Sequence, residues 1–327
     1  MGRGSVFGIL ARVTLPTVGA VQVGPVWRGL LLVSLAGIVW GTIGPGVQLI
    51  HDRSGLAPLT ISAYRALIAV AVLLVFSLAT GRLARSWSSA RNEWRRVATV
   101  GVLTATFQML FFVAVVVTGV SVTTVVCLGF APVLLLVLRS AQQRRLPSAG
   151  RGVPVIVAVV GLMLVSLTGS PIEGTSPPAL GIFAALGSGA AYALSAEVAG
   201  PLTRRLDTLT VTTATMSVAA AVLVPSGLVL ALVRGDTLTS SDNSSWLIIG
   251  YLGVVTMAVA YALLFTGLRS TPSGSVVVAT LLEPVTAVLI AVLFLGESLT
   301  TTGMVGSLLI VGVIASLGRQ MEEPPPQ

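Results

Sequence analysis

Glu283 and Pro284 lie side by side in the middle of a long apolar stretch, Ser273–Phe294. A helix of this length crosses a bilayer, and a charged side chain at its centre costs about 2.5–3.5 kcal/mol on insertion scales. Proline removes a backbone hydrogen bond and kinks a helix, which leaves a carbonyl for the protein or water to satisfy. Two such costly features together indicate a substrate or ion pathway. We expect Glu283 to carry a proton or to bind a cation; the alternative is a buried acid with a purely structural role.

Further polar side chains fall inside apolar stretches. Arg65 stays charged and binds carboxylates through two hydrogen bonds, so it either holds an anionic group of a substrate or forms a structural pair. Glu197 lies close to Arg204 and Arg205, where it either extends to the membrane surface or contributes to a gate. The remaining candidates could line a cavity or simply join helices, and they are Trp40, Tyr64, Gln108, Tyr192 and Tyr261.

The composition defines the class of protein. Hydrophobic residues make up 54% of the 327 residues and charged residues only 9%, whereas soluble domains carry about 25% charged residues, so we expect an integral membrane protein. One cysteine, Cys127, and one histidine, His51, exclude an intrachain disulfide and the usual clustered metal sites. We expect no cofactor and no enzyme activity, because few residues remain for acid–base chemistry. The chain has no phosphate-binding Gly-Lys-Ser loop, which argues against ATP-driven pumping.

Apolar runs and arginines together predict the topology. All nineteen basic residues are arginine, and an N-terminus inside the cell puts sixteen on the cytoplasmic side and only two, Arg53 and Arg234, outside. The net charge of +8 thus follows from topology and does not indicate a nucleic-acid partner. We expect a multi-pass protein of the bacterial plasma membrane with both termini cytoplasmic. Its ten predicted spans are 28–50, 57–79, 97–117, 120–138, 152–169, 179–201, 209–233, 246–268, 273–295 and 301–318.

A shift of 152 residues reveals an internal repeat. It aligns Gly101 with Gly253, Thr104 with Thr256, Ser121 with Ser273, Pro132 with Pro284, and Trp40 with Tyr192. We expect two five-helix repeats, residues 28–169 and 179–318, between a cytoplasmic extension, 1–27, and a cytoplasmic tail, 319–327. Because five is odd, the second repeat must be inverted. Inverted repeats with prolines that kink equivalent helices predict a midplane binding site in a secondary transporter.

The chain also resembles a known family. The residues that carry the resemblance are Trp40-Gly41, Tyr64-Arg65, Ser121 to Pro132, Glu283-Pro284-Val285, Leu295-Gly296-Glu297, and the glycines Gly303, Gly306 and Gly312. They are similar to the EamA-type branch of the drug/metabolite transporter superfamily over about 28–318. The resemblance implies an all-α membrane fold, a cavity between the halves, and alternating access driven by an ion gradient. One departure is Ala131, which stands where the second repeat has Glu283.

We therefore expect a secondary active exporter of small metabolites, such as amino acids or related and toxic compounds, with proton coupling through Glu283 or simple facilitation. The expected partners are the substrate, protons and the lipid bilayer, and the chain acts as a monomer or a homodimer. Two alternatives stay open at this point. One is a flippase for a lipid-linked intermediate, and the other is a membrane assembly subunit that transports nothing and uses Gly303 and Gly306 to bind partners.

Overall fold

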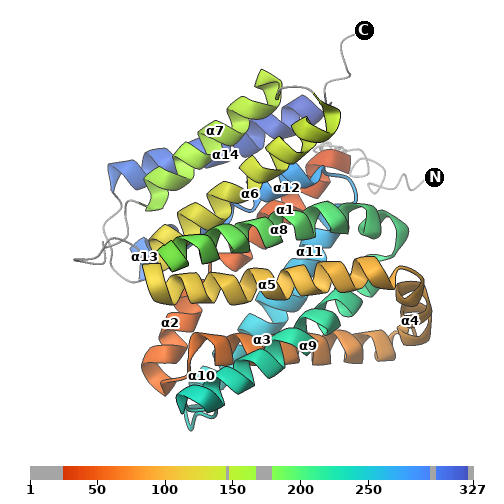
Figure 1. The fold of residues 1–327 in the computed structure, drawn as a ribbon, viewed down its shortest axis with the longest axis vertical. Helices are drawn as coiled ribbons and strands as arrows, with labels where there is room; N and C mark the ends of the chain where they lie inside the picture. Colours follow the sequence, from red (N-terminus) through yellow and green to blue (C-terminus); the bar gives the residue numbers. More distant parts are fainter. Residues whose placement is uncertain (1–24, 145–146, 167–178, 295–299, 323–327) are drawn as a thin grey trace, which may run out of the picture.

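The computed structural model describes residues 25–144, 147–166, 179–294 and 300–322, which form helices joined by short turns (Figure 1). In chain order these are α1 (Pro25–Trp40), α2 (Ile43–Ser54), α3 (Pro58–Ala79), α4 (Leu83–Asn92), α5 (Trp94–Thr118), α6 (Val120–Gln143), α7 (Ala149–Ser166), α8 (Ala179–Arg205), α9 (Thr208–Arg234), α10 (Asn243–Tyr251), the π-helical η3 (Leu252–Val259), α11 (Ala260–Gly267), α12 (Ser273–Ala279), α13 (Leu282–Phe294) and α14 (Thr301–Glu322).

Within these ranges, nine helical stretches are long and apolar enough to cross a membrane. They correspond to the first nine predicted spans, and the tenth corresponds to a shorter apolar helix, Thr301–Leu317. The predicted turn between the third and fourth spans is confirmed, because α5 ends at Thr118 and α6 begins at Val120. Gly119 has a φ of 81°, which glycine adopts without steric cost. The chain is thus a multi-pass, all-helical membrane protein.

The halves of the chain pack into one another. The most extensive helix contacts join α5 to α8, α3 to α9, α7 to α14, α6 to α8, α5 to α9 and α1 to α11, and each pair takes one helix from each half. Helices α7 and α14 lie together at one edge of the molecule, and α3 and α9 at the opposite edge (Figure 1). The 152-residue shift relates α3 to α9 and α7 to α14, so each of these helices packs on its own counterpart.

Glycines allow α7 and α14 to pack closely. A Cβ atom on Gly306 of α14 would lie 2.5 Å from the Gly161 carbonyl oxygen of α7, and one on Gly161 would lie 2.9 Å from the Gly306 carbonyl oxygen. Small residues allow helix backbones to approach in this way. Gly306 therefore serves helix packing inside the chain.

Several predicted features fall outside the described residues. These are residues 1–24 of the predicted extension, residues 167–169 of the first predicted repeat, the Leu295-Gly296-Glu297 motif, and residues 323–327 of the predicted tail. The last residues of the predicted extension belong to α1, which begins at Pro25.

Candidate functional site

Two predicted spans are interrupted near their middle. The first divides into α1 and α2 at Gly41 and Thr42, and the ninth divides into α12 and α13 at Thr280 and Leu281. Glu283 is the second residue of α13, and its N–H donates to the Thr280 carbonyl, 3.0 Å away. A helix begins here, so the interruption lies before Glu283.

The equivalent prolines of the two repeats, Pro132 and Pro284, occupy different positions in their helices. Pro284 is the third residue of α13, where the missing N–H costs no hydrogen bond because the first N–H groups of a helix have no partner within it. In place of the kink expected at Pro284, the helix breaks three to four residues earlier, at Thr280 and Leu281. Pro132 lies inside α6, which continues through it to Gln143. The repeats therefore differ in structure as well as in the exchange of Ala131 for Glu283.

Gly41 allows the two interruptions to touch. A Cβ atom at this position would lie 2.5 Å from the Thr286 Cβ and 2.6 Å from the Glu283 carbonyl oxygen. Both distances are far shorter than the 3.4–4 Å of ordinary contact. Gly41 thus packs the turn between α1 and α2 directly on the first turn of α13, which carries Glu283.

An aromatic cluster lies beside these interruptions. The Trp40 ring centroid lies 5.2 Å from that of Tyr261 and 6.4 Å from that of Tyr192, and Phe107 lies 5.2 Å from Tyr192. The Tyr192 hydroxyl is 2.8 Å from the Thr280 hydroxyl, at the interruption itself. Trp40, Tyr192 and Tyr261 are all buried. Trp40, Tyr192 and Tyr261, three predicted site residues far apart in sequence, therefore form one continuous aromatic surface.

The π-helical segment η3 supplies hydrogen-bonding groups to the cluster. The Trp40 indole N–H donates to the Thr256 carbonyl oxygen at 2.8 Å. The Arg65 Nη2 donates to the Thr256 hydroxyl at 3.2 Å, and that hydroxyl donates to the Leu252 carbonyl at 2.6 Å. A π-helical turn changes the backbone hydrogen-bond register, and such turns are frequent at functional sites. Sequence reasoning missed this role of Thr256, whose only signal was its alignment with Thr104.

Arg65 and Glu283 form an incomplete charge pair. Arg65 is 4% exposed, and its Nε has no hydrogen-bond partner. Glu283 is partly exposed and close enough to Arg65 to interact electrostatically, yet no ion pair within 4 Å joins the two, and no hydrogen bond to the Glu283 carboxylate occurs in the described ranges. The start of α13 also favours negative charge at Glu283 through the helix dipole. Both groups thus keep capacity for a ligand.

Gln108 borders the same site, whereas Tyr64 does not. The Ser62 hydroxyl, one helical turn from Arg65, donates to the Gln108 Oε1 at 3.4 Å, and the buried Gln108 Nε2 has no partner. Tyr64 packs on Trp246, with ring centroids 5.0 Å apart, and its hydroxyl donates to the Leu238 carbonyl at 2.6 Å. Tyr64 belongs to a separate small apolar cluster with α2 and α10. The structure thus places Tyr64 against Trp246 of α10 and the loop that precedes α10.

A small cavity of about 10 Å³ adjoins the aromatic cluster. It is enclosed by hydroxyl and aromatic side chains, among them Thr104, Phe107, Tyr192, Ser195, Tyr261 and Phe265. The Thr104 and Ser195 hydroxyls are 3.2 Å apart. A cavity of this size holds about one water molecule, so the aromatic side chains have to move before a metabolite can enter.

A polar cluster ties three helices together at the end of α12 away from Glu283. The Arg139 Nη2 of α6 lies 3.1 Å from the Glu197 Oε2 of α8 and donates to the Ser273 hydroxyl at 2.6 Å. The Ser273 hydroxyl, at the start of α12, donates to Glu197 in turn. The partner of Glu197 is thus Arg139, which the sequence did not single out.

These features define a class: a multi-pass membrane protein whose polar and aromatic groups gather where its helices are interrupted within the membrane. The family follows from comparison. Two segments of the chain, residues 27–167 and 179–318, match the EamA-like transporter family. The chain belongs to this family and is a membrane transporter.

Known relatives agree with this assignment. The chain is 29% identical over 286 residues to "Uncharacterized transporter YwfM" of Bacillus subtilis (strain 168), across 87% of this chain and 92% of that protein. It is 23% identical over 287 residues to "Uncharacterized inner membrane transporter YicL" of Salmonella typhimurium, across 88% and 94%. A crystal structure with 18% sequence identity superposes with a TM-score of 0.72 over 90% of this chain and 99% of its own, which shows a shared fold.

Proposed function

We propose that the protein is a secondary active transporter that exports small metabolites, such as amino acids or related compounds, across the bacterial plasma membrane. The observation that carries the proposal is the incomplete pair of Arg65 and Glu283 beside two interrupted helices. Two opposite charges that do not neutralise each other inside a membrane are costly, which argues for a role that needs both.

The free donors suggest how a substrate binds. The Arg65 Nε and the Gln108 Nε2 are buried and unpartnered, and each such group costs about 1–3 kcal/mol. A carboxylate or another acceptor on the substrate would remove this cost. Trp40, Tyr192 and Tyr261 would form an apolar wall with hydroxyl groups at its edge. In this proposal Glu283 binds either a cationic group of the substrate or a proton, which allows exchange of one for the other.

Alternating access requires a contact that opens and closes. The cluster of Arg139, Glu197 and Ser273 joins α6 of the first half to α8 and α12 of the second. The arginine distribution predicts that this end of the molecule lies at the cytoplasmic face. We propose that the cluster breaks when substrate enters from the cytoplasm, and that α12 then moves relative to α13 at Thr280 and Leu281.

The arrangement of the halves supports ten spans in two inverted repeats, and the arginine distribution favours cytoplasmic termini. The packing of α3 on α9 and of α7 on α14 is what a two-fold axis in the membrane plane would produce, because such an axis places equivalent helices together. In this arrangement α14 is the tenth span.

The test is counterflow into proteoliposomes with a pooled set of labelled amino acids and metabolites. Wild type should exchange at least one of them. Glu283→Gln should still exchange this compound but should not use a pH gradient to concentrate it. The control is Glu93→Gln, which removes an acid between α4 and α5 and should transport as wild type does. Equal accumulation by Glu283→Gln and wild type would refute proton coupling through Glu283. No uptake of any soluble compound would instead favour the flippase or the assembly subunit.

A further inference from the structure

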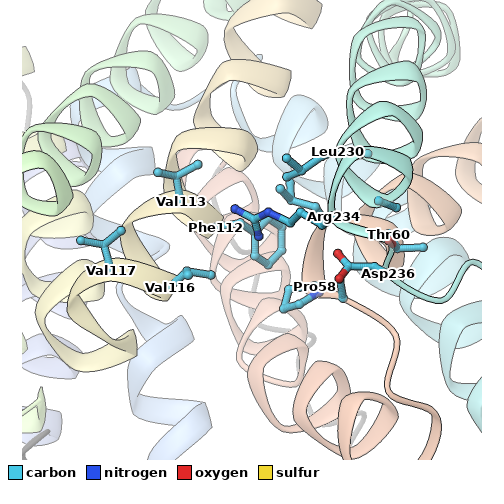
Figure 2. Close-up of a pocket in the computed structure, with 13 residues that line it drawn as sticks. Pro58, Thr60, Phe112, Val113, Val116, Val117, Leu230, Arg234 and Asp236 are labelled. Carbon is cyan, nitrogen blue, oxygen red and sulfur yellow. The ribbon is translucent and has the colours of Figure 1, made fainter.

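A second cavity lies at the ends of three membrane-spanning helices, away from the mid-span site (Figure 2). It has a volume of about 80 Å³ and is bounded by the start of α3, the end of α5 and the end of α9. The residues that matter for its chemistry are Pro58, Thr60, Phe112, Val116, Arg234 and Asp236. Because α3 begins and α5 and α9 end here, the cavity lies at the depth where lipid headgroups meet the hydrocarbon layer.

The cavity carries one positive and one negative side chain. Arg234 ends α9, and Gly235, with a φ of 71°, reverses the chain so that the Asp236 N–H bonds back to the Ala231 carbonyl at 2.9 Å. Figure 2 shows the Arg234 guanidinium next to Phe112 and the Asp236 carboxylate beside Thr60. In the part of the chain that the structure describes, neither charged side chain forms an ion pair or a side-chain hydrogen bond.

Thr60 adds an unsatisfied polar group. It lines the cavity, is only 3% exposed, and its hydroxyl has no hydrogen-bond partner. A buried polar group without a partner costs about 1–3 kcal/mol, and nothing in the immediate fold explains this cost. A ligand that reaches into the cavity with an acceptor oxygen would account for it.

The opposite wall of the cavity is apolar and open to lipid. Val113 and Val116 of α5 are 37% and 64% exposed, on a helix that spans the membrane, so they contact hydrocarbon chains. A ligand that fits this site therefore has an apolar tail, one anionic group and one cationic group within a short distance of each other. A polar, water-soluble metabolite would gain nothing from contact with the exposed valine side chains.

We propose that this cavity binds a zwitterionic phospholipid that carries a phosphate and a primary ammonium group. The phosphate binds Arg234, the ammonium donates to Asp236, an ester carbonyl accepts from Thr60, and an acyl chain follows α5 past Val113 and Val116. A primary ammonium offers hydrogen-bond donors to Asp236, which a quaternary ammonium does not. The site does not depend on the identity of the transported substrate.

The test is lipid binding to the purified full-length protein in detergent, measured by native mass spectrometry and by thermal unfolding. Wild type should bind phosphatidylethanolamine about tenfold more tightly than phosphatidylglycerol or phosphatidylcholine, since loss of one charge-assisted contact changes affinity by that order. Asp236→Asn should abolish the preference for phosphatidylethanolamine over phosphatidylglycerol. Arg234→Gln should weaken the binding of both lipids, and Thr60→Val should weaken it less.

Arg53→Gln is the matched control, because Arg53 is an exposed arginine at the end of a helix that does not line this cavity, and it should bind lipid as wild type does. Equal binding of all three lipids by wild type would overturn the proposal, and this comparison does not depend on whether any variant folds. A headgroup preference that survives in Asp236→Asn and Arg234→Gln would also overturn it.

Discussion

The contact between α7 and α14 yields a sharp prediction, because two glycines of α14 have opposite surroundings. A Cβ atom on Gly306 would lie 2.5 Å from the Gly161 carbonyl oxygen and 2.8 Å from the Val165 nitrogen, against 3.4–4 Å for ordinary contact. Both neighbours are backbone atoms of α7 and cannot rotate away. A Cβ atom on Gly312 would meet no atom within 4 Å. Gly306→Ala should therefore force the helices apart, whereas Gly312→Ala should not.

The magnitude follows from two terms. Either substitution gains about 0.5–1 kcal/mol, because alanine favours the helical conformation over glycine. Only Gly306→Ala incurs the cost of overpacking, typically about 1–3 kcal/mol. The gain in helix propensity is the same in both variants, so the free energy of unfolding of Gly306→Ala should be lower than that of Gly312→Ala by about 1–3 kcal/mol. With about 2–4 °C per kcal/mol for chains of moderate size, the difference in Tm should be several degrees.

The assay is thermal unfolding of both variants in the same detergent, followed by tryptophan fluorescence, with size-exclusion chromatography in parallel. Equal Tm values for Gly306→Ala and Gly312→Ala would refute the packing of α7 on α14. A Gly306→Ala variant that keeps its Tm but changes its oligomeric state would mean that Gly306 contacts a second copy of the chain. Gly161→Ala should be destabilised in the same direction, because its Cβ would lie 2.9 Å from the Gly306 carbonyl oxygen.

Two further predictions concern the end of the molecule that the arginines predict to be cytoplasmic. Arg139→Gln or Glu197→Gln should shift the population toward the state open at this end by about 1.4- to 5-fold, since a partly exposed ion pair contributes about 0.2–1 kcal/mol after solvent screening. The measurement is the labelling rate of a cysteine placed at the buried Val277 in a cysteine-free background, which should rise in both variants. Unchanged labelling would argue against the gate. Hydrogen bonds from Arg205 and Arg96 hold the pKa of the Glu93 carboxyl group below its usual 4.5. The stability gained is thus present above the unfolded-state pKa and is lost as pH falls through the lower folded-state pKa, so Glu93→Gln should flatten the acid limb of a Tm-against-pH curve, and parallel acid limbs would contradict this.

Much of the fold could be predicted from the sequence because the bilayer permits few structures. Backbone groups in hydrocarbon must bond within their own helix, so each apolar run of sufficient length becomes a span. Even the weakly marked turn at Gly119 was predictable, since a continuous apolar run from Val97 to Leu138 is too long for one crossing. The two-repeat pattern and the family resemblance followed from glycine, proline and aromatic residues at matching positions.

The hydrogen-bond partners could not be predicted, because they depend on which groups the packing brings within about 3 Å. Arg65 meets Thr256 across 191 positions of sequence, and no local pattern marks the π-helical turn that presents it. Tyr64, next to Arg65 in the chain, points to a different cluster, because successive helical residues face different directions. The sequence by itself thus determined the membrane-spanning helices and the acid at their centre. Only the tertiary structure decided which side chains surround that acid, because a helix of given sequence can pack through any of its faces.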